Sequence, residues 1–259
     1  MNIVVCIKQV PDSAARMVVE GGQVSWGDAP LVLNPWDEYA VEVALQQKEA
    51  HGGTVTVLSK GGESTKEAII SALAMGCDQA YLINDPTLVG SDSQAVAHVL
   101  AAAIRKVGDL DLACFGKQAI DADMGVTAPM TARLLGWPML SLVSVVQALD
   151  PAGKTIRIER SIEEGRQVVE SKLPAVITVS KDVGEPRYPS FMGIRKARRA
   201  EIPAWSLADL GIAAPATVVR WPEVINPPVR EVVTEIITGS SPQDIADKLA
   251  EKILAEKVL

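Results

Sequence analysis

The stretch that decides the fold is residues 54–83, which read TVTVLSKGGESTKEAIISALAMGCDQAYLI. The run TVTVLS has the β-branched, apolar character of a buried strand, and AYLI at the end of the stretch has it again. Between them, Ser64 and Glu67 have the spacing of a capping box that opens a helix, and Gly76 marks the end of that helix. The stretch therefore predicts one strand–helix–strand unit.

The same alternation continues on both sides of this unit. An apolar strand is predicted within residues 2–10, and a helix follows in residues 34–53. The Gly-Ser-Asp turn at residues 90–92 supplies cap residues for an alanine-rich helix that ends near Lys106, and residues 110–115 form a fourth strand. This order predicts an α/β fold with a doubly wound, mainly parallel sheet and right-handed crossovers.

The second half of the sequence departs from this alternation. A helix is predicted at residues 127–135. Short alternating segments joined by turns then predict antiparallel additions to the sheet at residues 143–149, 155–160 and 167–171. The apolar run at residues 173–179 has the pattern of a strand that rejoins the main sheet.

The C-terminal part is organised differently. Residues 184–205 mix Pro, Gly and Arg without a clear period, and residues 213–228 are Pro-rich and extended. A capped, amphipathic helix pattern follows at residues 241–253. We predict a nucleotide-binding α/β domain in residues 1–212, and an extended arm with a terminal helix in residues 213–259 that embraces another subunit.

Composition and charge argue against several functional classes. The net charge of −7 disfavours nucleic acid as a partner, in spite of a basic cluster at residues 195–199. No apolar run approaches the length of a membrane span, so we expect a cytoplasmic protein without membrane insertion. His51 and His98 lie outside any hydrolase or metal-binding pattern, so no catalytic residue and no metal site are predicted. The three cysteines lack C-x-x-C spacing and are expected to be reduced core residues.

The strongest candidate binding site follows the fourth strand. Open α/β sheets bind ligands at the carboxyl ends of their strands, and the most polar strand end here is residues 116–123. A helix opens directly after it, where free N–H groups at residues 126–128 can hold a phosphate. Asp121 or Asp123 can cap that helix or bind a ribose. Taken alone, the pattern supports a nucleotide site and a loop that only caps its helix about equally.

Other strand ends and loops lie on the same predicted edge of the sheet. They are the end of the first strand at residues 6–10, the loop Asn34-Pro35-Trp36-Asp37, and Ser59-Lys60-Gly61 after the second strand. Because the carboxyl ends of parallel strands meet at one edge, these segments can converge on an adenine and its ribose.

Motifs along the whole chain resemble one family. They are Asn34-Pro-x-Asp37, Ala72-Leu-Ala-Met-Gly-Cys-Asp78, Gly116-Lys-Gln-Ala-Ile-Asp121, Leu173-Pro-Ala-Val-Ile-Thr178, Glu185-Pro-Arg-Tyr188 and Ile194-x-Lys-Ala197. With these motifs the sequence resembles the β subunit of electron transfer flavoproteins, including their nitrogen-fixation relatives. The resemblance implies a sheet of the adenine-nucleotide α-hydrolase-like type.

The resemblance implies a heterodimer with a larger α subunit, whose C-terminal domain carries the electron-transferring FAD, while this chain holds AMP. The chain would then be part of an electron carrier rather than an enzyme by itself. The implied AMP contacts are Cys6, Asn34, Pro35, Trp36, Asp37, Lys60, Lys117, Gln118, Ala119, Ile120, Asp121, Ala122, Asp123, Met124, Gly125, Val126, Thr127 and Ala128. This chain departs from the family at Val126 and Ala128, where a Gln and a Gly are common.

The resemblance also implies a recognition loop at about residues 185–200. This loop would dock on partner dehydrogenases of the acyl-CoA or a related type, and the electrons would pass on to a membrane quinone reductase. Phe191 takes the position of the anchor residue, and the alternative is that it folds back into the core of its own chain. The other implied contact residues are Tyr188, Met192, Ile194 and Lys196.

Two other functions remain as alternatives. The turn Gly90-Ser91-Asp92-Ser93 resembles the Gly-Ser-Asp-Thr turn of a flavin-bifurcating, NADH-oxidising branch, in which a second FAD replaces AMP. Ser59-Lys60-Gly61 and Asp121-Ala-Asp-Met124 are unlike the motifs of that branch, and they favour AMP. The other alternative is a stand-alone adenine-nucleotide-binding module that needs no partner.

Overall fold

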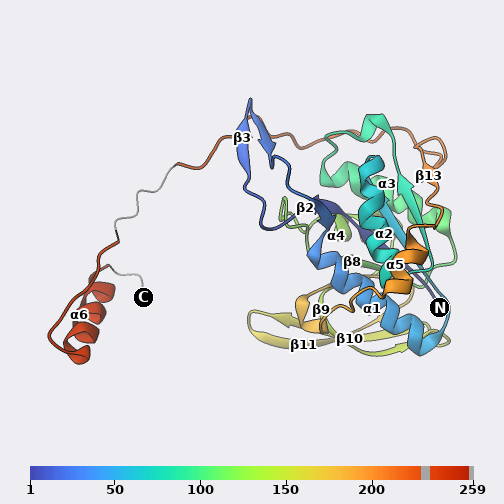
Figure 1. Ribbon diagram of the computed structural model, residues 1–259. Helices are drawn as coiled ribbons and strands as arrows, with labels where there is room; N and C mark the ends of the chain where they lie inside the picture. Colours follow the sequence, from blue (N-terminus) through green and yellow to red (C-terminus); the bar gives the residue numbers. More distant parts are fainter. Residues whose placement is uncertain (229–233, 257–259) are drawn as a thin grey trace. The chain divides into compact units, whose positions relative to one another are not determined.

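A nine-stranded sheet forms the centre of the first part of the chain (Figure 1). The computed structural model describes residues 1–228 and 234–256, and the chain divides into two compact units, Met1–Val224 and Ile225–Leu259. The strand order of the sheet is β11-β10-β9-β12-β8-β1-β6-β7-β13. The predicted α/β class with a large, mainly parallel sheet is confirmed.

Parallel strands form the larger part of this sheet. They are β1 (Asn2–Ile7), β6 (Thr54–Lys60), β7 (Gln79–Ile83), β8 (Leu112–Gly116), β12 (Ala175–Val179) and β13 (Ala204–Trp205). Every residue of β8 and β12 is buried, because both faces of the sheet are covered. Successive side chains of β1 therefore enter different cores: Ile3 and Val5 lie in one apolar cluster and Val4 and Cys6 in another.

Helices supply the rest of these two cores. They are α1 (Pro35–His51), α2 (Lys66–Met75) and α5 (Phe191–Ala197) on one face, and α3 (Ser93–Val107) and α4 (Thr127–Leu135) on the other. Asp92 caps α3, as predicted, by accepting a hydrogen bond from the backbone N–H of Ala95 at 2.8 Å. The three cysteines are free and buried among these elements.

The antiparallel additions are present at one side of the sheet. They are β9 (Met139–Asp150), β10 (Thr155–Ile162) and β11 (Gly165–Lys172), in which β10 pairs antiparallel with both neighbours. β9 begins four residues before the predicted start at residue 143, because its first residues pair in parallel with β12 (Val176 with Met139). β12 thus joins the additions to the parallel strands, as its apolar pattern predicts.

Several short elements escaped the sequence analysis. β2 (Gln9–Pro11) pairs with β5 (Leu31–Leu33), and the hairpin of β3 (Val18–Glu20) and β4 (Gln23–Ser25) lies between them. Single 3₁₀ turns form η1 (Glu63–Thr65), η2 (Pro86–Leu88) and η3 (Lys181–Val183). Helix α5 lies in a segment that we expected to be irregular, since its seven residues are too few for a visible period.

The capping box predicted at Ser64 is wrong. The residue before α2 is Thr65, which has helical backbone angles and makes no capping bond through its side chain. The chain enters α2 through the turn η1, where the N–H of Thr65 donates to the carbonyl of Gly62 at 3.0 Å. This local bond supplies a partner for an N–H at the helix start, so no side-chain cap is needed. The predicted end of the helix at Gly76 is confirmed.

The second unit contains the predicted terminal helix, α6 (Pro242–Ala255). Ser241 caps it by accepting a hydrogen bond from the N–H of Asp244 at 3.2 Å. The apolar side chains of Ile245 and Leu249 on this helix are exposed. None of the helices in the described part of the chain combines the length and the apolar character that crossing a membrane requires.

Candidate functional site

A cavity of about 410 Å³ opens at the carboxyl ends of the central parallel strands. The ends of β1, β6 and β8 contribute to its lining together with the loop that leads from β8 to α4. The predicted site residues that line it are Cys6, Asn34, Asp37, Lys60, Lys117, Gln118, Ala119, Ala122, Met124, Gly125, Val126, Thr127 and Ala128. The two groups of strand ends that the sequence placed on one edge therefore meet around one cavity.

Five predicted site residues lie outside the lining of this cavity: Pro35, Trp36, Ile120, Asp121 and Asp123. The first two form the first turn of α1, and the indole ring of Trp36 lies 5.4 Å from the ammonium group of Lys117. Ile120 and Asp121 line a smaller pocket of about 130 Å³.

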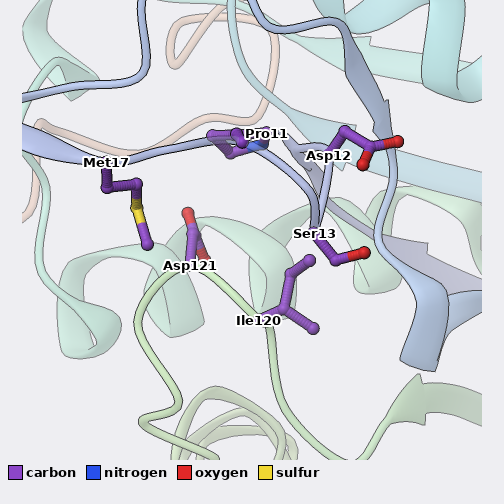
Figure 2. A pocket seen from close by; sticks show the side chains of 7 residues that line it. Pro11, Asp12, Ser13, Met17, Ile120 and Asp121 are labelled. Atoms are coloured by element: carbon purple, nitrogen blue, oxygen red, sulfur yellow. The ribbon is translucent and has the colours of Figure 1, made fainter.

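The smaller pocket lies between the loop after β8 and the segment that follows β2 (Figure 2). Pro11, Ser13 and Met17 face Ile120 and Asp121 across it. Lys8 lines the larger cavity, and its ammonium group pairs with the carboxylate of Asp121 at 2.6 Å. The ion pair therefore joins the linings of the two cavities.

The structure excludes a helix-capping role for Asp121 and Asp123. The residue before α4 is Val126, and no side chain caps this helix. Asp121 is engaged with Lys8, and Asp123 accepts a hydrogen bond from the side-chain amide of Gln118 at 2.7 Å. The side chains of Asp121 and Asp123 thus hold the loop between β8 and α4, and neither of them caps α4.

Asn34 fixes this loop to the start of α1. Its side chain is buried, its amide nitrogen donates to the carbonyl of Gln118 at 2.9 Å, and its amide oxygen accepts from the N–H of Ile120 at 3.2 Å. Both polar atoms therefore bind the backbone of the loop. Asn34 lies at the cavity, as predicted, and acts there by shaping its wall.

Asp37 performs the same task one turn further along α1. Its buried carboxylate accepts hydrogen bonds from the N–H of Lys8 at 2.7 Å and from the N–H of Gly116 at 3.2 Å. Burial raises the pKa of this carboxyl from 3.8 to about 7, against the opposing effect of the N–H groups. A Cβ atom at Gly116 would lie 2.6 Å from the carbonyl carbon of Trp36. This glycine therefore permits the approach of α1.

The lining of the cavity contains basic groups and N–H groups that can bind an anion. Lys60 donates from its ammonium group to the carbonyl of Leu88 at 3.1 Å. Burial, and secondly the charge of Lys8, lower the pKa of Lys60. Residues 126–128 line the cavity at the start of α4, where first-turn N–H groups have no partner inside the helix. These groups suit a phosphate.

The lining of the cavity also contains residues that the sequence analysis missed. They are the apolar residues Val96, Leu100, Phe115 and Met130, the turn at residues 90–94, and Val219 and Trp221. The turn was visible in the sequence as a helix start and as a family-like motif. Val219 and Trp221 carried no signal, because more than 120 residues separate them from this turn, to which the N–H of Val219 is bonded.

The predicted recognition residues form an exposed patch, here called the recognition patch: Tyr188, Phe191, Met192, Ile194 and Lys196. Phe191 is 79% exposed, so the alternative that it folds back into the core is wrong. Arg187 holds this segment, because its guanidinium binds the buried carboxylate of Glu42 at 2.8 Å and also pairs with Glu49. Gly193 fixes the other end of this segment by packing closely against α2. A Cβ atom at Gly193 would lie 2.5 Å from the carbonyl oxygen of Ala74.

Comparison with known proteins places this geometry in a family. A family model described as "Electron transfer flavoprotein domain" matches residues 26–210. The chain belongs to the electron transfer flavoprotein family. The resemblance found in the sequence motifs is confirmed.

The family relatives cover most or all of the chain. "Electron transfer flavoprotein subunit beta" of Megasphaera elsdenii is 35% identical over 100% of both chains. "Protein FixA" of Azorhizobium caulinodans is 39% identical over 82% of this chain and 77% of its own. "Caffeyl-CoA reductase-Etf complex subunit CarD" of Acetobacterium woodii is 34% identical over 100% of both chains. This electron transfer flavoprotein chain is thus of the β-subunit type, which implies an α-subunit partner.

Proposed function

We propose that this chain is the electron transfer flavoprotein β subunit that holds AMP in the cavity at the ends of β1, β6 and β8. The observation that supports this most directly is the mixed lining of the cavity. The lining offers Lys60 and the N–H groups of residues 126–128 to a phosphate, and it also contains the apolar side chains of Leu100 and Phe115. A nucleotide combines the same two kinds of group, a charged phosphate and a planar base.

The residues of this chain would hold the ligand and would not move protons. The buried carboxylate of Asp37 and the amide of Asn34 are bonded to backbone groups, and burial raises the pKa of the Cys6 thiol well above its ordinary value. A protonated thiol is a poor nucleophile. The FAD of the assembly would supply the electron chemistry when bound, and this chain would position the parts around it.

A second candidate function is the bifurcating type, in which FAD takes the place of AMP. The observation that favours it is that Gly90, Ser91 and Asp92 contribute to the lining of the cavity. Their resemblance to the Gly-Ser-Asp-Thr turn extends the possible site toward a longer ligand. Both candidates share an adenine nucleotide in the same cavity.

Cofactor content decides between these candidates. The chain is co-expressed with the α subunit of the same organism, and the purified complex is denatured and its flavins and adenine nucleotides are quantified. One FAD and one AMP per heterodimer are expected. Two FAD would establish the second candidate, and a chain that forms no complex and remains a stable monomer would support the stand-alone nucleotide-binding module.

A matched pair of lysine variants tests the location of the phosphate. Lys60→Met removes a cation from the cavity, while Lys66→Met removes one from an ion pair with Glu63 on the surface of α2. We expect Lys60→Met to lose most of its bound nucleotide, because charge-assisted bonds to phosphate are strong, and Lys66→Met to retain it. Equal retention in both variants would remove Lys60 from the site.

We propose further that the recognition patch docks on partner dehydrogenases of the acyl-CoA or a related type, and that electrons continue to a membrane quinone reductase. Phe191 lies beside Arg195, Lys196, Arg198 and Arg199, all exposed, and none of these four makes an ion pair among the described residues. An exposed aromatic residue among unpaired cations suits an apolar pocket with an acidic rim.

Electron transfer from a dehydrogenase tests this patch. Phe191→Ala is expected to slow the reduction of the complex by about tenfold or more at low dehydrogenase concentration, as loss of a buried anchor residue does. Val168→Ala on β11 truncates another exposed apolar residue and should leave the rate unchanged. Equal rates for Phe191→Ala and the parent protein would rule out the docking role.

A further inference from the structure

The segment at residues 218–221, here called the strap, forms part of the wall of the nucleotide cavity. Val219 and Trp221 line the cavity, although the strap belongs to no helix or strand. Trp221 is 72% exposed, which is unusual for so large an apolar side chain. A side chain in this position loses water contact when a ligand fills the cavity beside it.

One carboxylate ties the strap to the cavity. Asp92 uses one oxygen to cap α3 and the other to accept hydrogen bonds from the N–H groups of Val218 and Val219, each at 2.8 Å. These backbone bonds hold the pKa of Asp92 below its ordinary value, the bond from Ala95 first. Asp92 itself lines the cavity, so the tether lies at its rim.

The chemistry around the strap indicates what it covers. Trp221 lines the cavity together with the apolar side chains of Val96, Leu100 and Phe115, and Lys60 and the start of α4 belong to the same lining. Phosphate binds to the cation and the N–H groups, which leaves the apolar part of the lining for the planar ring of the ligand. Indole rings stack favourably on such rings.

We propose that Trp221 covers the planar ring of the bound nucleotide and that Asp92 is the positioning residue that holds Trp221 there. The inference rests on the proposed function, because it assumes an adenine nucleotide in this cavity. It adds to the site Trp221, which lies outside the motifs named in the sequence, and it assigns the strap a part in ligand retention.

The chain contains a matched control for the tether. Asp85 also uses one oxygen to cap a turn, with the N–H of Thr87 at 3.0 Å, and the other to bind a distant backbone N–H, that of Leu207 at 3.2 Å. Asp85 does not line the cavity. Asp85→Asn therefore weakens the same kind of tether in a place where the ligand is not affected.

The test is the release of nucleotide from the purified heterodimer. AMP or FAD that remains bound is measured at intervals after transfer into nucleotide-free buffer, for the parent complex and for Trp221→Ala, Trp221→Phe, Asp92→Asn and Asp85→Asn. Loss of one stacked ring predicts release about tenfold faster for Trp221→Ala. Trp221→Phe should restore slow release, Asp92→Asn should release faster than the parent, and Asp85→Asn should match the parent.

Different results would overturn the AMP-holding role of the chain and the role of Trp221. A parent complex that carries no adenine nucleotide would overturn the proposed function and the inference together. Nucleotide-loaded Trp221→Ala and Asp92→Asn complexes that release at the parent rate would overturn the inference alone. Because the side chain of Trp221 is mostly exposed, its removal should leave the free energy of unfolding nearly unchanged, which separates retention from stability.

Discussion

The wall of the cavity and the recognition patch differ in how their polar groups are satisfied. At the cavity, Asn34 and Asp37 are both buried, Asn34 is bonded to the backbone of the loop after β8, and Asp37 is bonded to the N–H groups of Lys8 and Gly116. On the patch, the cations from Arg195 to Arg199 make no ion pair within the described chain, and Phe191 lies in solvent. A wall that is complete before binding suits a small ligand, and a surface with unused groups suits a protein partner.

Helix α1 supports both regions, through two carboxylates in opposite electrostatic settings. Asp37 at its start has a pKa raised by burial to about 7. Burial also raises the pKa of Glu42, but the hydrogen bonds and the charge of Arg187 outweigh this and leave the pKa below its ordinary value. The cavity wall thus depends on a carboxyl that is costly to ionise, and the patch depends on one that is easily ionised.

The largest effect is expected from the cavity wall. Asn34→Ala would leave a partly buried carbonyl and a partly buried N–H of the loop without their side-chain partner, so we expect a loss of about 3 kcal/mol in the free energy of unfolding. Urea unfolding of the chain measures it. Gln147→Ala removes an exposed amide from β9 and should cost less than about 0.5 kcal/mol. Similar losses in both variants would show that Asn34 does not hold the loop.

The support of the recognition patch should be next in size. Arg187→Met leaves the buried carboxylate of Glu42 without its cation, and we expect a loss of about 2 to 3 kcal/mol at pH 7. Because the pKa of Glu42 is lowered in the folded chain, this contribution is present above about pH 4.5 and is lost as the pH falls below it. Unfolding at pH 7 and pH 4 measures both. Arg157→Met, which breaks an exposed pair with Glu170, should have little effect.

Asp37 should show the opposite dependence on pH. Because its pKa is raised from 3.8 to about 7, the protonated form favours the folded chain, and this contribution is lost as the pH rises through that range. The stability of the parent relative to Asp37→Asn should fall by about 3 kcal/mol between pH 4 and pH 7. The exposed Asp28→Asn serves as the control. A constant difference across this range would contradict the raised pKa.

The smallest effect is expected from the pair that joins the two cavities. Lys8→Met breaks a partly exposed ion pair with Asp121, and such pairs contribute less than about 1 kcal/mol. Lys66→Met, which breaks the exposed pair with Glu63, should cost about as much. Thermal unfolding of both variants measures the difference. A much larger loss in Lys8→Met would place the support of the loop at this ion pair rather than at Asn34.

Local patterns predicted most of the fold. The strand–helix alternation, the cap at Asp92 and the cap at Ser241 depend on residues within one turn or strand, so the sequence displays them directly. The cap predicted at Ser64 was wrong, because a backbone hydrogen bond of η1 competes with side-chain capping. The spacing of Ser64 and Glu67 does not distinguish the two. The short helix α5 lacked the length for a period.

The candidate site was predictable where strand ends determine it. Cys6, Lys60 and the loop after β8 meet because parallel strands end at one edge, which is a consequence of the fold class. The contact of Asp92 with Val218 and Val219 joins segments more than 120 residues apart and follows no local rule. The roles of Asn34 and Gly116 in holding the wall needed the path of the loop as well.

The position of β12 between β8 and β9 has a consequence for how the chain is made. A nascent chain that ends before Ala175 already contains β8 and β9, but each of them still has an unpaired edge facing the gap that β12 will fill. Such edges pair readily with other chains. During synthesis, two strands therefore have unpaired edges until residues 175–179 leave the ribosome. Fragments that end before β12 should aggregate under conditions in which longer chains fold.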